Sequence, residues 1–459
     1  MRNEQISLPD GWAWGTIGDI ADFLDNLRVP VSAKQREKRI ANKPSSVLYP
    51  YYGANGQVGW IDKYIFDQEL ILLAEDGGFF GDKSKFIAYR INGKSWVNNH
   101  AHVLKPRQGI EARYLQFVLN DCNIMPYVRG TTRLKLNQSD AKKIRVALPP
   151  SFEQKRIVTK VEALFAESKT AREAVNRVPI LLKRFRQSIL NKAFAGELTQ
   201  RNSSDTPAQE LIDRIKATRC SKKSAQYSED EVEENKSFPT IPKSWAWSKF
   251  GSLFDVAVGS TPKRNSTQFW GGDIPWVSSS EVAFCRIKAT REQITEEGMR
   301  RSNLHLRPPG TILLAMIGEG KTRGQCAILD IKAATNQNIA SIIDVDSYMP
   351  SEYVYYWLMS QYEETRCSGE GGAQPALNSQ RVRQIPIPIA PLEEQKRIVI
   401  KIQELFAIAD AILDATNIAK KSADKIDHSL LAKAFRGELV PQDPNDEPAS
   451  VLLQRVKAG

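Results

Sequence analysis

The chain has 459 residues, which is too long for one hydrophobic core and enough for three or four folded units of about 100–200 residues. Its 41% hydrophobic and 25% charged residues are typical of a soluble globular protein, and no apolar run approaches the roughly 18–20 residues needed to span a bilayer. The net charge of +11, concentrated in residues 1–150, is compatible with a polyanionic partner.

Five cysteines, an odd number with no Cys-x-x-Cys pair, indicate free thiols in a reducing compartment. The polar N-terminal stretch has no apolar signal core. We therefore expect a cytoplasmic protein.

The first 147 residues are rich in Gly, Pro, Trp and Tyr and contain short apolar runs. Residues 70–74 predict a buried strand followed by a Gly-bearing turn, and residues 114–119 predict a buried helix. Trp12 and Trp14 stand just before the first expected strand, where we expect them to pack against the base of the domain rather than stack on bases. These features predict a mixed α/β domain over residues 1–147.

Residues 148–218 have a different character and predict one long helix followed by a short one. Apolar or small residues recur at alternating spacings of three and four from Ile157 to Ile189, which is the heptad seam of a coiled coil. Pro179 is expected to kink the long helix or to remove one of its hydrogen bonds. The short helix, over residues 207–216, is amphipathic and appears alone, so we expect a partner helix to pack there. Residues 219–241 are polar and carry their positive and negative charges in separate blocks, which predicts a linker.

The remaining chain repeats this plan, with a second α/β domain over 242–388 and a second helical region over 389–459. Residues 148–158 return as 389–399, and the Ala-Phe-x-Gly-Glu-Leu motif at 193–198 returns at 434–439, both 241 residues later. Trp245 and Trp247 repeat the opening tryptophans, and the seam returns from Ile398 to Leu430. We therefore predict an α+β protein of two pseudo-symmetric units, each with a mixed α/β domain followed by a long helix. The two long helices are expected to form an antiparallel coiled coil.

Catalytic and metal-binding signatures are missing from the sequence. The stretch 318–322 ends in Gly-Lys-Thr, but Ala315 occupies a position where a phosphate-binding loop requires Gly. His100 and His102 could share one face of a strand, but the sequence offers no third ligand beside them. We therefore expect a binding and scaffolding protein that is not an enzyme and has no cofactor or metal.

Two divergent domains that alternate with two near-identical helices resemble the specificity subunit of type I DNA restriction–modification systems. The resemblance covers essentially the whole chain. It is carried by the Glu-Gln-Lys-Arg-Ile-Val motifs at 153–158 and 394–399, the two Gly-Glu-Leu motifs, residues 183–190 and the tryptophan-bearing openings. Ser151 and Phe152 depart mildly from the pattern, since the second copy has Pro391 and Leu392.

The resemblance implies that each variable domain is a target recognition domain for one half of a split double-stranded DNA sequence. It also implies that the paired helices hold the domains apart and dock two methyltransferase subunits, which restriction/translocase subunits join. S-adenosylmethionine, ATP and Mg²⁺ would belong to those partners. Physical reasoning adds that a fixed spacer should place the two half-sites about one helical turn (~34 Å) or slightly more apart.

DNA contacts require basic or small polar side chains, and base readout favours Arg, Lys, Asn and Gln. In the first domain the candidates are Lys34, Arg36, Lys38, Arg39, Lys83, Lys85, Arg129, Arg133 and Lys135. In the second they are Lys263, Arg264, Lys321, Arg323 and Gln374. For each of them, a solvated surface charge is the competing interpretation.

Two other classes of function stay open on the sequence alone. A scaffold that joins two protein partners without DNA would show no salt-sensitive binding to polyanions, and the basic excess in residues 1–150 argues against it. An enzyme with unrecognised catalytic residues would be active as the isolated chain.

Overall fold

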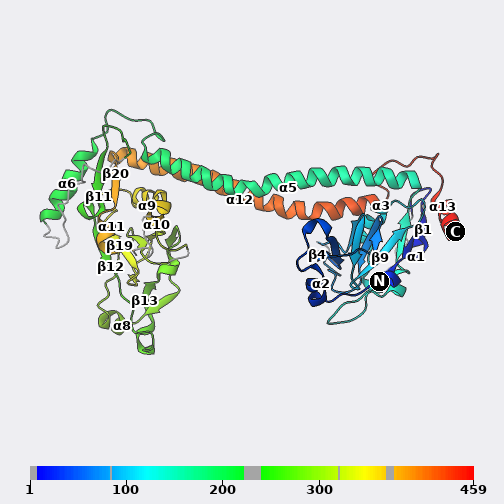
Figure 1. Cartoon of the computed structure of the whole chain (residues 1–459). Helices are drawn as coiled ribbons and strands as arrows, with labels where there is room; N and C mark the ends of the chain where they lie inside the picture. The colour runs from blue at the N-terminus through cyan, green and yellow to red at the C-terminus, as the bar shows by residue number, and fades with distance from the viewer. Residues whose placement is uncertain (1–7, 83–84, 222–238, 319–320, 368–376, 459) are drawn as a thin grey trace. The chain divides into compact units, whose positions relative to one another are not determined.

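The structure, a computed structural model, describes residues 8–82, 85–221, 239–318, 321–367 and 377–458. The chain divides into two compact units (Figure 1): Met1–Arg177 with Ala415–Gly459, and Val178–Asp414. Both long helices, α5 (Ser151–Phe194) and α12 (Leu392–Phe435), contribute to each unit. Among the described residues, no helix has the length and apolar content that a membrane span requires.

The first unit contains the α/β domain expected from residues 1–147. One of its sheets has the strand order β2-β9-β6-β7, and a second has the order β4-β3-β8-β5. The strands of these sheets are β2 (Ala21–Phe23), β9 (Ala101–Pro106), β6 (Leu70–Ala74), β7 (Ala88–Ile91), β4 (Gly56–Ile61), β3 (Tyr49–Gly53), β8 (Lys94–Val97) and β5 (Phe66–Asp67). A separate pair joins β1 (Ala13–Thr16) to β10 (Arg145–Leu148). The helices of this α/β domain are α1 (Ile17–Ile20), α2 (Ala33–Ile40), α3 (Ala112–Asp121) and α4 (Gln138–Ala141).

The second unit repeats this plan with a differently divided sheet. One sheet has the order β12-β19-β16-β17-β14 and the other β15-β13-β18. The strands are β12 (Asp255–Val258), β19 (Ile339–Ile343), β16 (Ile312–Ala315), β17 (Cys326–Leu329), β14 (Cys285–Ile287), β15 (Glu292–Ile294), β13 (Trp270–Val277) and β18 (Ala334–Thr335). β11 (Ala246–Lys249) pairs with β20 (Pro386–Ile389), as β1 does with β10. The helices are α7 (Phe250–Leu253), α8 (Glu296–Arg301), α9 (Ser351–Ser360), α10 (Tyr362–Cys367) and α11 (Ser379–Arg383).

The predicted buried elements are confirmed in both units. All five residues of β6 and all four of β16 are buried, as expected for central strands that have a helix on one face. The predicted buried helices are α3 and α9. In each, a fully buried tyrosine hydroxyl (Tyr114 or Tyr353) donates to a carbonyl of the last strand of its domain, at 2.7 and 2.8 Å.

The repeated Glu-Gln-Lys-Arg motif has a specific contact for three of its four residues. Glu153 accepts a hydrogen bond from Trp12 Nε1 at 3.1 Å, and the Gln154 amide donates to the carbonyl of Pro149. Arg156 pairs with Asp446 at 2.7 Å. The copies of these residues at 394, 395 and 397 make the copies of these contacts, with Trp245, Ala390 and Asp205. The motif therefore recurs because it fastens each long helix to an α/β domain.

The four opening tryptophans do not behave alike. Trp12 and Trp245 are buried at the domain base, as predicted. Trp14 is 43% exposed with the Arg145 guanidinium over its ring, so the prediction is wrong there, because Trp14 lies on the outward face of β1. Trp247 is half-buried and packs edge-on against Trp357.

α5 and α12 run antiparallel in each unit, as the seam predicts. Ser168 contacts Asp427 in the first unit and Arg186 contacts Asp410 in the second. Pro179 lies inside α5 and does not end it. Five seam positions are exposed, which corrects the prediction of a continuous buried seam: Ala171, Phe185, Ile412, Ala419 and Ile426. A straight helix drifts away from a seven-residue repeat, so seam positions leave the contact wherever the two helices do not supercoil around each other.

The short helices are not alone, because this chain itself covers their apolar faces, and the reason for expecting a partner helix there does not hold. α6 (Ala208–Ser221) buries Ala208, Leu211, Ile212 and Ile215 in the core of the second unit. α13 (Ala449–Ala458) buries Ala449, Leu452, Leu453 and Val456 in the core of the first, beside β1 and α1 (Figure 1). Each short helix therefore packs on the α/β domain of the other sequence copy.

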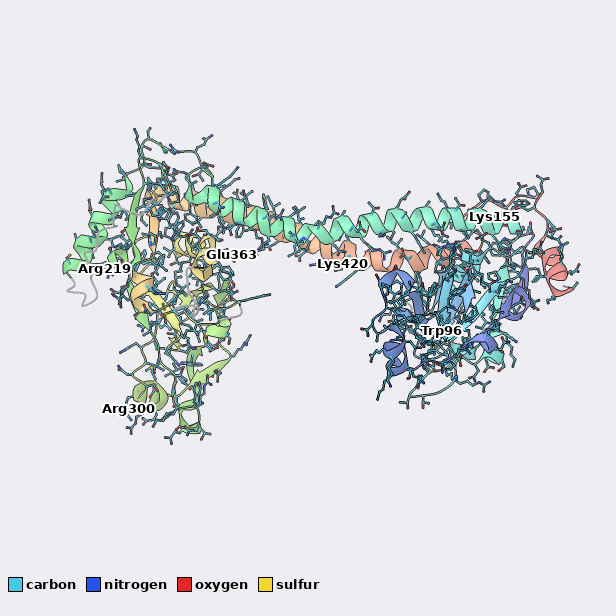
Figure 2. The ribbon with its side chains drawn as sticks, viewed as in Figure 1. Trp96, Lys155, Arg219, Arg300, Glu363 and Lys420 are labelled. Carbon is cyan, nitrogen blue, oxygen red and sulfur yellow. The ribbon has the colours of Figure 1, made fainter. Side chains whose placement is uncertain are left out.

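α6 also runs five residues beyond its predicted end at residue 216. The side chain of Arg219, labelled in Figure 2, is 3% exposed and pairs with Asp255 at 2.7 Å, which fastens the last turn of the helix. The predicted linker therefore begins later than expected, and most of it lies outside the described residues.

Candidate nucleic-acid interface

A charged cluster lies where β6 ends in the first domain. Glu75 and Asp76 follow this buried strand, and their side chains are largely covered. Arg133 and Lys135 reach them from the loop before α4, at 3.0 Å to Asp76 and 3.1 Å to Glu75. The Arg133 side chain is 68% exposed. The two carboxylates thus lie beneath the basic side chains and hold them at the surface, where they could bind an anion.

The pKa of Asp76 reflects this arrangement. Burial by itself would raise it, but the hydrogen bonds from Arg133 and His100 and the nearby positive charges hold it below the ordinary value. Asp76 therefore stays ionised at neutral pH and orients Arg133.

Asp25, Glu75 and His102 converge beneath this cluster, and their ligand-type atoms lie within 4.8 Å of one another. Sequence reasoning missed this group because only the fold brings Asp25 and Glu75 to His102. His102 Nδ1 lies 2.6 Å from Asp25, and Nε2 lies 2.8 Å from the carbonyl oxygen of Leu136. Both ring nitrogens already have oxygen partners, and Arg28 pairs with Glu75 at 2.8 Å. The chemistry of the set is that of an internal ion network rather than a preformed metal site.

The second domain has different chemistry at the same places. Leu73 pairs with His102 across β6 and β9, and Leu314 pairs with Ala340 across β16 and β19. By the same registers, Asp25 corresponds to Val258 and Glu75 to Met316. The ion network of one domain is therefore an apolar site in the other. At the next position the exposed Ile317 stands where the first domain has Asp76, so one backbone plan carries two unlike surfaces.

Arginines stack on aromatic rings of the sheet that contains β3 in the first domain and of the sheet that contains β13 in the second. The Arg36 guanidinium lies 4.7 Å from the Tyr51 ring centroid, and that of Arg39 lies 4.7 Å from Trp96, which is labelled in Figure 2. Arg264 lies 4.1 Å from the Trp270 centroid and pairs with Glu292. Such stacking fixes the direction of a guanidinium before any ligand arrives.

The other candidate contacts fall into four groups. Lys34 and Lys38 are exposed on α2, and Lys263 and Lys321 are exposed on loops. Lys85 is exposed over the Phe79 ring, and the exposed Arg129 makes two hydrogen bonds to Asp140. Arg323 is only 8% exposed, because it lies within the turn after β16, so the structure does not present it to a ligand. Lys83 and Gln374 lie outside the described residues.

Gly318 and Lys321 lie in the loop between β16 and β17. Gly318 has a φ of +131°, and a side chain there would meet Thr322 Cβ at 2.9 Å. Two residues of this loop, 319 and 320, lie outside the described residues.

Two recognition-type domains, a paired-helix scaffold and unlike surfaces at equivalent positions define a class of protein that reads two different targets with one chain. The chain matches the family described as type I restriction modification DNA specificity domain over residues 9–177 and 242–419, and it belongs to that family.

Relatives and solved structures agree with this assignment. The chain is 28% identical to the type I restriction enzyme EcoDI specificity subunit of Escherichia coli, over 89% of this chain and 88% of that protein. It is 31% identical to the MjaIX specificity subunit of Methanocaldococcus jannaschii, over 44% and 46%. Its fold is similar to that of the HsdS subunit from Thermoanaerobacter tengcongensis, with a TM-score of 0.58, 17% identity, and coverage of 96% and 100%.

Proposed function

We propose that the chain is the DNA specificity subunit of a type I restriction–modification complex. Residues 1–147 and 242–388 are its two target recognition domains, and each reads one half of a split double-stranded target. The observation that carries the proposal is the pair of unlike surfaces on one repeated scaffold, since a symmetric protein would read the same half-site twice. In this role the chain recognises DNA and catalyses no reaction, and it acts in the cytoplasm, where its target lies.

Each domain is proposed to contact DNA through its own exposed cations. In the first domain these include Lys34 and Lys38 on α2 and Arg133 and Lys135 over the acidic pair. In the second they include Lys263, Arg264 and Lys321. Cations that are already oriented by a carboxylate or an aromatic ring lose less side-chain entropy when they bind a phosphate or a base edge.

Methyltransferase subunits are proposed to dock on the paired helices, and restriction/translocase subunits to join the complex they form. The helix pair leaves several large apolar side chains uncovered: Ile180, Leu181, Phe185, Ile400, Ile408 and Ile418. Apolar side chains gathered on a helix surface favour contact with another protein.

The function is tested by sequencing the methylated bases of genomic DNA from cells with and without this gene, with the methyltransferase expressed in both. We expect methylation in one motif made of two short blocks with a fixed spacer. Exchanging residues 242–388 for those of a relative should change one block only. No change in methylation when the gene is removed would contradict the proposal.

The contact of Arg133 with DNA is tested by measuring affinity over a series of salt concentrations. Arg133→Ala should weaken binding and lower the slope of log affinity against log salt by about one, the value for one lost phosphate contact. Lys155→Ala on α5 removes the same charge from the helix and should leave the slope unchanged. Equal effects of both variants would argue against a direct contact at Arg133.

A further inference from the structure

α5 and α12 are two copies of one helix, and among the described side chains one ion pair joins them in each unit. In the first unit, Asp427 of α12 forms an ion pair with Arg172 of α5 at 2.5 Å and accepts a hydrogen bond from Ser168 of α5 at 3.1 Å. In the second unit, Arg186 of α5 donates to Asp410 of α12 and lies over the Phe406 ring.

The two contacts are one contact made twice with the helices exchanged. Arg186 of α5 and Asp427 of α12 are equivalent positions, 241 residues apart, and so are Lys169 and Asp410. In the first unit, Asp427 faces the turn of α5 that contains Lys169 and Arg172. In the second unit, its equivalent Arg186 faces the turn of α12 that contains Asp410, the equivalent of Lys169. In both units α5 supplies the positively charged side chain of the ion pair, and α12 supplies the negatively charged one.

This polarity decides which helices can pair. If α5 met a second copy of α5 in the same geometry, Arg186 would face Lys169 and Arg172 at both contact sites. If α12 met a second α12, Asp427 would face Asp410 twice. Like charges placed opposite each other disfavour a pairing, and only the combination of α5 with α12 puts opposite charges at both sites.

The contacts at the helix ends do not distinguish α5 from α12. Arg156 pairs with Asp446, and its copy Arg397 pairs with Asp205, the copy of Asp446. The same residue types occupy both copies, so this contact would form equally well in any combination of helices. At the two inner contacts, by contrast, the charge differs between the copies, because Arg186 corresponds to Asp427 and Lys169 to Asp410.

We propose that the inner face of the helix pair is a charge-coded interaction surface whose intended occupant is the α12 helix of the same chain. The code rejects pairing of either helix with its own kind in another copy of the chain. It thereby prevents an assembly in which two identical recognition domains would share one helix pair. The inference concerns the pairing of the helices and goes beyond recognition of DNA.

The test uses the full-length chain with its helix charges rearranged. Arg186→Asp combined with Asp427→Arg places like charges at both sites within the chain, and it favours like-with-like pairing between chains. The net charge stays at +11. We expect this variant to shift toward a two-chain mass in light scattering. A tagged copy should recover about tenfold more untagged copy per site than the parent does.

Two further variants decide the interpretation. Adding Arg172→Asp and Asp410→Arg to the first variant inverts the code completely, and the single-chain mass should return. Arg186→Asp with Asp410→Arg replaces the same number of side chains but keeps opposite charges within the chain, so its self-association should lie between those of the parent and the first variant.

The completely inverted variant also covers the case in which the first variant does not fold. If circular dichroism shows the first variant unfolded and the inverted one folded as a single chain, the code is supported. The proposal is overturned if the first variant behaves as the parent does. It is also overturned if complete inversion fails to restore the single chain.

Discussion

Leu452 on α13 is expected to stabilise the first α/β domain although the two are far apart in sequence. The side chain is 2% exposed and lies against Gly109 in the core of the first unit. Truncating a buried leucine to alanine costs about 3 kcal/mol when the site cannot collapse. A loss of that size corresponds to about a hundredfold increase in the population of locally opened molecules.

Hydrogen exchange measured by mass spectrometry resolves where that stability is lost. Leu452→Ala should raise exchange in β1, α1 and β2 and leave β11 and β12 unchanged. Leu211, the equivalent residue of α6, is buried in the second unit, so Leu211→Ala should give the opposite pattern. If Leu452→Ala loosened the second unit as much as the first, the assignment of α13 to the first domain would be refuted.

Two further results are expected. Gly437→Ala should lower the free energy of unfolding by about 2 kcal/mol or more, because φ is +72° there and the new Cβ would lie 2.3 Å from Pro9 Cγ. Gly93→Ala, at φ +76° with no atom within 4 Å, should cost only the backbone strain of about 1 kcal/mol, and equal losses in chemical denaturation would contradict this reasoning. Glu153→Gln should make thermal stability less dependent on pH. Burial raises the pKa of Glu153 above its ordinary 4.5, so the stability that this group contributes is complete below pH 4.5 and is lost as pH rises through the raised value. Because glutamine still accepts from Trp12, the melting temperature of the variant relative to the parent should rise between pH 4.5 and 7, and a constant difference would argue against a buried charge.

Local patterns in the sequence were sufficient for the elements and for the plan of the molecule. The apolar run at 70–74 predicted β6, and the heptad spacing predicted the long antiparallel helices. These features depend on residues near one another in the chain, or on a repeat that can be read directly. The prediction that seam residues are buried failed at positions such as Ala171 and Ile426, where burial depends on the angle of the partner helix.

The features that could not be predicted are those that depend on which element packs on which. The amphipathic pattern of α13 predicts a buried face but does not name the domain that covers it. Asp25, Glu75 and His102 are far apart in the sequence, and no local signal connects them. Arg323 is a residue type typical of surface contacts, but the turn after β16 follows a path that buries its side chain.

The assignment of both chain ends to the first unit has a consequence for synthesis on the ribosome. The second unit is one uninterrupted segment, Val178–Asp414, whereas the first needs residues 415–459 to complete its core. The first α/β domain must therefore wait, without Leu452 and Leu453 to cover it, until α13 has been translated, about 300 residues after the domain itself. At the usual rate of about 5–20 residues per second, the wait is tens of seconds. During this interval the nascent first domain should be the part of the molecule most dependent on chaperones.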